Sequence, residues 1–222
     1  MHNFDSENFY AFVIPNSNNH GAQNFFRRLY KYFDSKNKLL IIENDETFLK
    51  NFIKLSKISK KENLKLITTV NSNKLGLFFK MLHPNVDLIS RLGNTVSQEI
   101  MKFTPKFFFH KFFYFLLIIF SKKIIFQSAV MLDDFVSFFN FTKNSDKFCI
   151  IHNGIEMNPH TSSYNLNKFN VSKTHFLLVG SFKYQKGYDV FFNSLELLTK
   201  DLLKSSHFHI CGDGDLLESY KQ

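Results

Sequence analysis

The sequence predicts an α/β protein built on a parallel β-sheet, and three observations lead to this prediction. Short apolar segments alternate with longer amphipathic segments along the 222 residues, which is the pattern of repeated strand and helix units. Each short segment is apolar throughout, as is typical of strands that helices cover on both faces. A hydrophobic content of 44% is that of a folded chain rather than a disordered one.

Eight apolar segments of four to six residues are predicted to be strands. In chain order they are 10–14, 38–42, 65–70, 86–90, 123–127, 148–152, 175–179 and 207–211. Helices are predicted where apolar residues recur at helical spacing. They include 23–33, the segment around 48–53, 188–203, and a helix that begins at Leu216.

The most apolar segment of the chain is FFFHKFFYFLLIIF, at residues 107–120. It is shorter than the roughly 20 apolar residues that a transmembrane helix needs, and His110 and Lys111 interrupt it. Two interpretations stay open. The segment is either a core helix packed on the sheet or an interfacial helix that lies on an anionic membrane.

The alternation of strands and helices stops between residues 154 and 172, where Asn, Ser and Thr are frequent. We therefore predict a complete N-terminal domain at 1–153, a linker at 154–172, and the start of a second domain at 173–222. Two strands and one helix are too few to bury a core of their own. We expect the second domain to be incomplete or to be completed by another chain.

Composition and motifs exclude several classes of function. The net charge is +9, but the lysines are scattered rather than clustered, which argues against nucleic-acid binding. Cys149 and Cys211 lie in separate apolar strands, so they favour neither a disulfide scaffold nor a metal site. Residues 1–7 carry no basic segment before an apolar one, so we expect a cytoplasmic protein. Motifs of acyl transfer, P-loop nucleotide binding and zinc hydrolysis are absent.

Glycine-containing turns follow three of the predicted strands. The turn at 15–22 contains His20 and Gly21 and leads directly into a helix, whose N-terminus attracts anions. The turn at 180–187, GSFKYQKG, places two lysines at the start of the next helix, where they would offset the charge of a diphosphate. Each of these turns, taken alone, is also explained as an ordinary connection between a strand and a helix.

The third turn, at 212–215, reads GDGD. Asp213 and Asp215 could form a carboxylate pair for a metal ion. We disfavour that interpretation because Asp215 suits the N-cap of the helix predicted to begin at Leu216. His207 and His209 share one side of the preceding strand and are interpreted as packing residues.

Two other strand ends carry candidate residues. Arg91 follows the strand at 86–90, at the expected carboxyl edge of the sheet, where open α/β sheets bind ligands. A surface arginine is the alternative. Gly154 closes the first domain and is predicted to occupy a turn with positive φ.

Taken in this order, these segments resemble the retaining glycosyltransferases of the group 1 family, which have the GT-B fold of two Rossmann-like domains. The resemblance rests on residues 19–22 (NHGA), 123–128 (KIIFQS), 151–155 (IHNGI), 180–189 (GSFKYQKGYD) and 212–214 (GDG). His20 stands where the family has a glycine, and Ser181 where it usually has an arginine. The resemblance implies a complete N-terminal Rossmann-like domain and the first β-α-β part of a second one.

The resemblance also implies a reaction and a set of site residues. A sugar would pass from a nucleotide diphosphate sugar to a glycan or lipid-linked acceptor in surface polysaccharide synthesis, without a metal or another cofactor. The donor diphosphate would lie at Gly21, Lys183, Lys186 and Gly187. The nucleotide would lie at Gly212, Asp213 and Gly214. His20, Arg91 and Asn94 would line the acceptor site or the cleft, where Arg91 and Asn94 would touch donor or acceptor. An anionic membrane is a further expected partner.

The family's later segment, whose paired glutamates bind the donor, is not found in these 222 residues. We therefore expect a chain truncated within its second domain. Two alternatives from another class are a non-catalytic remnant and one subunit of a split glycosyltransferase, completed by a second chain. A sugar-nucleotide epimerase on the same fold is a third alternative.

Overall fold

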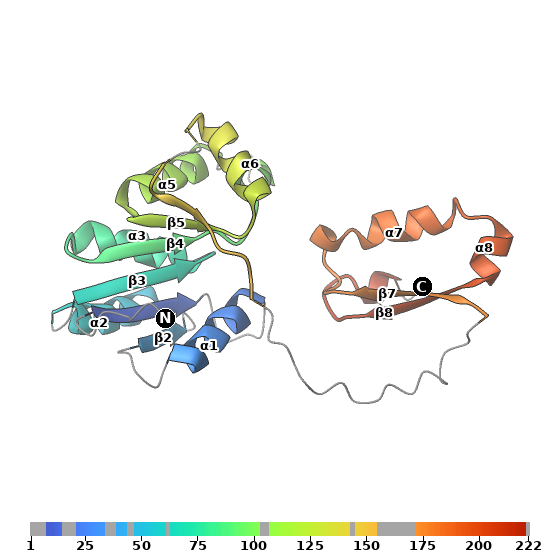
Figure 1. The fold of residues 1–222 in the computed structure, drawn as a ribbon, viewed down its shortest axis with the longest axis horizontal. Coiled ribbons are helices and arrows are strands. Elements are labelled where there is room, and N and C mark those ends of the chain that lie inside the picture. Colours follow the sequence, from blue (N-terminus) through green and yellow to red (C-terminus); the bar gives the residue numbers. More distant parts are fainter. Residues whose placement is uncertain are drawn as a thin grey trace. The chain divides into compact units, whose positions relative to one another are not determined.

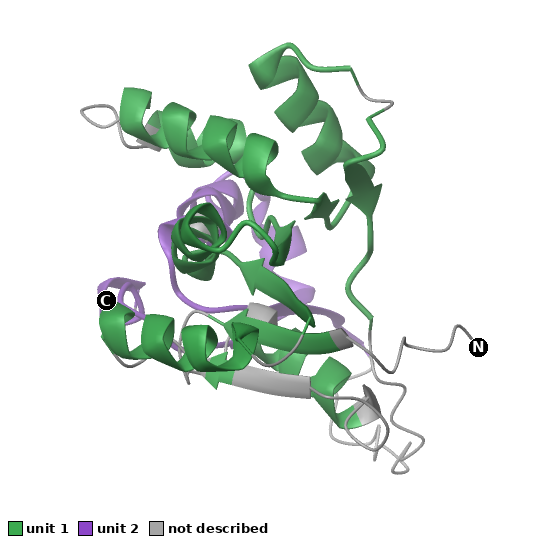
Figure 2. Cartoon of the chain, turned by 90° about the vertical axis from the view of Figure 1, so that its left-hand side faces the viewer, with its two compact units in different colours: residues 1–156 green, residues 157–222 purple. Residues whose placement is uncertain are grey.

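The computed structural model describes residues 8–14, 21–33, 39–43, 47–60, 63–102, 107–142, 145–154 and 172–220. The chain divides into two compact units, residues 1–156 and 157–222, which Figure 2 colours separately. The predicted linker at 154–172 lies outside the described residues except at its two ends. All eight predicted strands are confirmed, each with ends within two residues of the predicted ones.

Unit 1 is an α/β layer built on a six-stranded parallel sheet in the order β2-β1-β3-β4-β5-β6 (Figure 1). The strands are β1 Asn8–Ile14, β2 Leu39–Glu43, β3 Asn63–Thr69, β4 Asp87–Arg91, β5 Lys123–Phe126 and β6 Phe148–Ile150. The chain adds β2 on one side of β1 and β3 on the other, as in Rossmann-like doubly wound folds. The carboxyl ends of β1 and β3 are therefore the switch point at which such sheets bind ligands.

Among the described residues, six helices connect these strands. They are α1 Gly21–Phe33, α2 Phe48–Ser59, α3 Ser72–Leu82, α4 Val96–Lys102, α5 Phe107–Phe120 and α6 Ala129–Phe139. The side chains of β1 alternate between two cores, because successive strand residues point to opposite faces. Phe12 and Ile14 pack with Phe26 of α1, whereas Ala11 and Val13 join the larger core on the other face.

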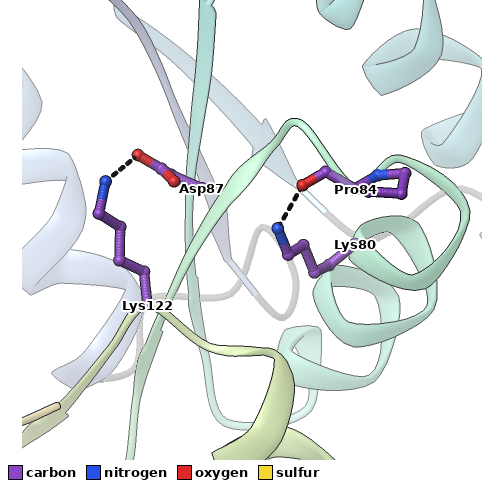
Figure 3. Close-up of polar contacts among 4 residues, drawn as sticks. All are labelled: Lys80, Pro84, Asp87 and Lys122. Carbon is purple, nitrogen blue, oxygen red and sulfur yellow. Dashed lines mark hydrogen bonds and ion pairs between the residues drawn. The ribbon is translucent and has the colours of Figure 1, made fainter.

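Two polar contacts near the amino end of β4 fix the start of this strand (Figure 3). Nζ of Lys122 lies 2.6 Å from Oδ2 of Asp87, which ties the residue before β5 to the first residue of β4. Nζ of Lys80 donates to the carbonyl oxygen of Pro84 at 2.6 Å and closes the turn after α3. Both contacts lie at the edge of the sheet opposite to the carboxyl ends.

Unit 2 contains the parallel strands β7 Thr174–Val179 and β8 Ser206–Cys211. The helix predicted at 188–203 is two helices, α7 Tyr188–Leu195 and α8 Lys200–Lys204. The break arises because the Thr199 side chain accepts a hydrogen bond from the backbone N–H of Leu202 and caps a new helix. The helix predicted from Leu216 is also wrong, since a turn and a short 3₁₀ helix, Glu218–Tyr220, follow β8 there.

Burial corrects one further prediction and explains another. The apolar strand that contains Cys211 is predicted to be covered on both faces, but Cys211 is exposed. The helix α5 buries Tyr114, Leu117 and Ile118 against the sheet layer, so its core interpretation is confirmed for that side. Within the described ranges, no helix is both long and apolar enough to cross a membrane.

Candidate functional site

Arg91 ends β4 and is the largest fully buried side chain of the described residues, with 2% of its surface exposed. Its Nη1 donates a hydrogen bond to Oγ1 of Thr69, at the end of β3, at 3.1 Å. Its Nη2 donates to Oδ1 of Asn153, which follows β6, at 2.6 Å. Its Nε is buried and has no hydrogen-bond partner among the described residues. The alternative of a surface arginine is therefore wrong.

Two phenylalanines of α1 lie against the guanidinium group. Cζ of Arg91 is 4.8 Å from the ring centre of Phe25 and 5.7 Å from that of Phe26, within the range of cation–π attraction. Burial lowers the pKa of Arg91 from 12.5 to about 10, so the group is still positively charged at neutral pH. Its hydrogen-bond partners in the described part of the chain are neutral, so neither of them offsets this buried charge.

Amides at neighbouring strand ends hold the partner Asn153 in place. Its Nδ2 donates to Oε1 of Gln127, just after β5, at 2.9 Å. Nε2 of Gln127 in turn donates to the carbonyl oxygen of Leu92 at 3.2 Å. Because each of these residues follows the carboxyl end of a parallel strand, one polar chain runs along the edge of the sheet from β4 to β6.

The start of α3 fixes the other side of the site. Oγ of Ser72 accepts a hydrogen bond from the backbone N–H of Thr69 at 2.9 Å and lies 2.6 Å from the carbonyl oxygen of Val13. Nδ2 of Asn73 donates to the carbonyl oxygen of Arg91 at 3.2 Å. These contacts join the carboxyl ends of β1, β3 and β4, so the groups around the guanidinium are held in fixed positions.

A small polar cavity of about 80 Å³ lies nearby in unit 1. The residues that line it come from the start of α3 and from α4 and α5: Val70, Asn71, Lys74, Glu99, His110, Phe113 and Tyr114. Burial raises the pKa of Tyr114, and the charge of Glu99 and a hydrogen bond to it raise the pKa further. Asn94 is exposed, and its Nδ2 donates to Oε2 of Glu99 at 3.4 Å, so its contact is with this cavity's carboxylate rather than with Arg91.

In unit 2, the turn after β7 presents two lysines. Lys183 and Lys186 are exposed, and Lys186 contributes to the lining of a cavity of about 230 Å³ together with Gly180, Tyr188 and Phe191. Gly187 has a φ of 66°, a left-handed conformation that glycine adopts without strain. The turn therefore has the basic side chains and the open volume that an anionic ligand needs.

Gly212 and Gly214 have a packing role. A Cβ atom at residue 212 would lie 1.8 Å from the carbonyl oxygen of Gly180, and one at residue 214 would lie 2.7 Å from that of Phe182. The backbone N–H of Phe182 donates to the carbonyl oxygen of Asp213 at 2.9 Å. Only residues without a side chain allow the turns after β7 and β8 to approach this closely.

Three histidines gather on one face of the β7–β8 pair. Nδ1 of His175 lies 2.8 Å from Nε2 of His209, and the ring centres of His207 and His209 are 4.5 Å apart. Burial, followed by the nearby His209, His175 and Lys173, lowers the pKa of His207. In the part of the chain that the structure describes, no group of three His, Cys, Asp or Glu side chains could hold a metal ion.

The remaining predicted site residues have different outcomes. His20 lies outside the described residues, and Gly21 is the first residue of α1. Gly154 does not have a positive φ, so the conformation predicted for it is wrong. Sequence reasoning missed Thr69. It included Gln127 and Asn153 in the segments that carry the resemblance but gave them no role in a site. A polar residue at or just beyond the carboxyl end of each apolar strand was the signal that could have found them.

Comparison of the chain with models of known protein families and with curated proteins finds no match.

Proposed function

We propose that the chain is part of a glycosyltransferase that moves a sugar from a nucleotide diphosphate sugar to a hydroxyl group of a glycan or lipid-linked acceptor. The observation that carries this proposal is Arg91, a buried cation with neutral partners on the strand next to the switch point of a Rossmann-like sheet. A donor of this class brings the anionic diphosphate that such a group would bind. The GT-B arrangement of two such domains is part of the same proposal.

The proposed reaction separates charge at the diphosphate. The acceptor oxygen forms a bond to the anomeric carbon, the bond from that carbon to the phosphate oxygen breaks, and the hydroxyl proton leaves with the diphosphate or passes to water. Negative charge grows on the departing diphosphate, and preorganised cations stabilise such charge strongly. In unit 2, we assign this task to Lys186, which borders the 230 Å³ cavity.

Release of nucleoside diphosphate from uridine- and guanosine-diphosphate sugars tests this proposal. We expect the Lys186→Ala variant to lower the rate by about tenfold or more, in line with the loss of one charged group at a reacting oxyanion. Lys200→Ala removes another exposed lysine of unit 2 and should leave the rate unchanged.

The other outcomes are equally informative. An unchanged rate in Lys186→Ala would remove the role that we assign to this lysine. If nucleoside diphosphate binds but is not released from the sugar donors, the chain is a non-catalytic nucleotide-binding protein rather than an enzyme.

A further inference from the structure

The helix α5 is apolar on two sides, although a helix at the surface of a globular unit is normally polar on its outer side. Its inner side is the buried one described above. Phe108, Phe112, Phe115 and Ile119 follow one another at four-, three- and four-residue steps, which places them on a single face. Phe108 and Phe112 are 82% and 58% exposed, and the other two are nearly half exposed. We call these four residues the α5 stripe.

The stripe is continued by a fifth apolar side chain. Phe109 lies beside it and is 77% exposed. Single exposed apolar residues are ordinary, but a contiguous patch of large ones marks an interaction surface. The stripe consists of hydrocarbon groups, so its occupant must be apolar where it touches the stripe.

The charged groups of α5 itself are basic. Apart from the buried Tyr114, its ionisable residues are His110 and Lys111, and the helix contains no carboxylate. Lys111 is exposed, and its Nζ lies 5.5 Å from the ring centre of Phe138. The whole chain carries a net charge of +9, so the occupant of the stripe should be anionic where it meets the rim.

Further lysines lie at the C-terminal end of α5. Nζ of Lys147 donates to the carbonyl oxygens of Ile118 and Ile119 at 2.9 and 3.1 Å, and it thereby places a positive charge at the negative end of the helix dipole. Lys122 and Lys123 follow directly after α5 and are exposed, and Lys122 is the one that is paired with Asp87. Both ends of the stripe therefore have basic neighbours.

We propose that the α5 stripe binds the surface of an anionic lipid bilayer, with its phenylalanines among the upper acyl chains and the adjacent lysines at the phosphate groups. Helices that lie in a membrane interface combine an apolar face with flanking basic residues in this way. A second copy of the chain fits less well, because it would bring an equally basic surface against the stripe. This proposal does not depend on the proposed sugar transfer.

Sedimentation of the full chain with vesicles tests the proposal. We expect binding to vesicles of equal parts phosphatidylglycerol and phosphatidylcholine, and much weaker binding to pure phosphatidylcholine. The double variant Phe108→Ser, Phe112→Ser should lower the partition coefficient on the anionic vesicles by about tenfold or more, because two largely exposed rings no longer enter the bilayer. Raised salt should weaken the binding of the unchanged chain.

Two controls make the result specific. Leu197→Ser removes an apolar side chain of unit 2 that is 85% exposed, and it should leave the partition coefficient unchanged. Circular dichroism of the double variant should match that of the unchanged chain, since the replaced side chains point to solvent. Equal binding of the double variant, or no binding to anionic vesicles, would overturn the proposal. Loss of a dimer in the double variant, without vesicle binding by the unchanged chain, would assign the stripe to self-association instead.

Discussion

The charge of Arg91 is buried among groups that solvate it only in part. A buried guanidinium is normally offset by a carboxylate, because transfer of a charge out of water is costly. Here two hydrogen bonds to Thr69 and Asn153 and two aromatic rings take that place, and Nε remains without a partner in the described residues. These partners do not neutralise the positive charge of Arg91, so this charge can attract an anion.

A carboxylate placed beside this guanidinium should compete with the ligand. Asn153 is exposed, so the carboxylate of an Asn153→Asp variant loses little hydration. Oδ1 of Asn153 lies 2.6 Å from Nη2 of Arg91, so the new charge is close to the guanidinium. An ion pair replaces a hydrogen bond from the charged guanidinium to a neutral amide. Although the bond from Nδ2 to Gln127 is lost, we expect the free energy of unfolding to rise by about 1 kcal/mol. The affinity for nucleoside diphosphate should fall.

Thermal unfolding and ligand titration of the same variant check this prediction together. Asn153→Ala is the matched control, because it removes the bond without adding charge and should lower stability. A variant Asn153→Asp that is both less stable and equally strong in ligand binding would show that Arg91 is not accessible to an anion.

The histidines of β7 and β8 predict a pH dependence of stability. The pKa of His207 is lowered from 6.5 in the folded chain, so the unfolded chain binds more protons between that lowered value and 6.5. Stability should therefore be constant above pH 6.5 and fall as the pH drops below it. An NMR titration should place the pKa of His207 below 6.5, and His207→Gln should reduce the loss of melting temperature between pH 7 and pH 5. A pKa at or above 6.5 would contradict the packing of the three rings.

At the scale of elements, the turns after β7 and β8 fit together through their glycines. Gly212→Ala would place a Cβ atom 1.8 Å from the carbonyl oxygen of Gly180, so the turns must separate. We expect a loss of about 2 kcal/mol or more in the free energy of unfolding of unit 2. Gly154→Ala is the control, since nothing lies within 4 Å of a Cβ atom there. Chemical denaturation measures both, and equal stability of the two variants would contradict the close approach.

The strands could be predicted well because each is a short continuous apolar run between polar turns. The helix at 188–203 could not, since its apolar spacing continues across the break and only the Thr199 cap reveals it. The segment at 107–120 left two interpretations open, and the structure explains why. One side of α5 packs in the core while the stripe faces outward. A single apolar segment therefore has both a core side and an exposed apolar side.

The candidate site was harder to predict than the strands. The position of Arg91 at the end of a strand marked it as a candidate, but its burial depends on Phe25 and Phe26, which reach it from a helix far away in the sequence. Asn153 becomes its partner only because β6 pairs with β5 and β5 with β4. The spacing of residues in the sequence does not show which strands and helices become neighbours.

At the scale of the whole chain, both units repeat one arrangement. Each has parallel strands followed by polar turns that lead into helices, and each has basic side chains at those turns, Arg91 in unit 1 and Lys183 and Lys186 in unit 2. Anions bind readily at such places, because backbone N–H groups and the helix dipole add to the charge of the side chains. The proposed function therefore depends first on the binding of an anionic ligand.

Isothermal titration of the full chain with uridine and guanosine diphosphate tests this requirement most directly. We predict that one of them binds, and that Arg91→Met weakens its affinity by about tenfold or more. The stability of that variant should change by less than about 2 kcal/mol, because an apolar chain of similar length replaces a costly buried charge. Arg28→Met removes an exposed arginine of α1 and should leave the affinity unchanged. Equal affinity of the unchanged chain and Arg91→Met would contradict the assignment of Arg91 as the anion-binding group.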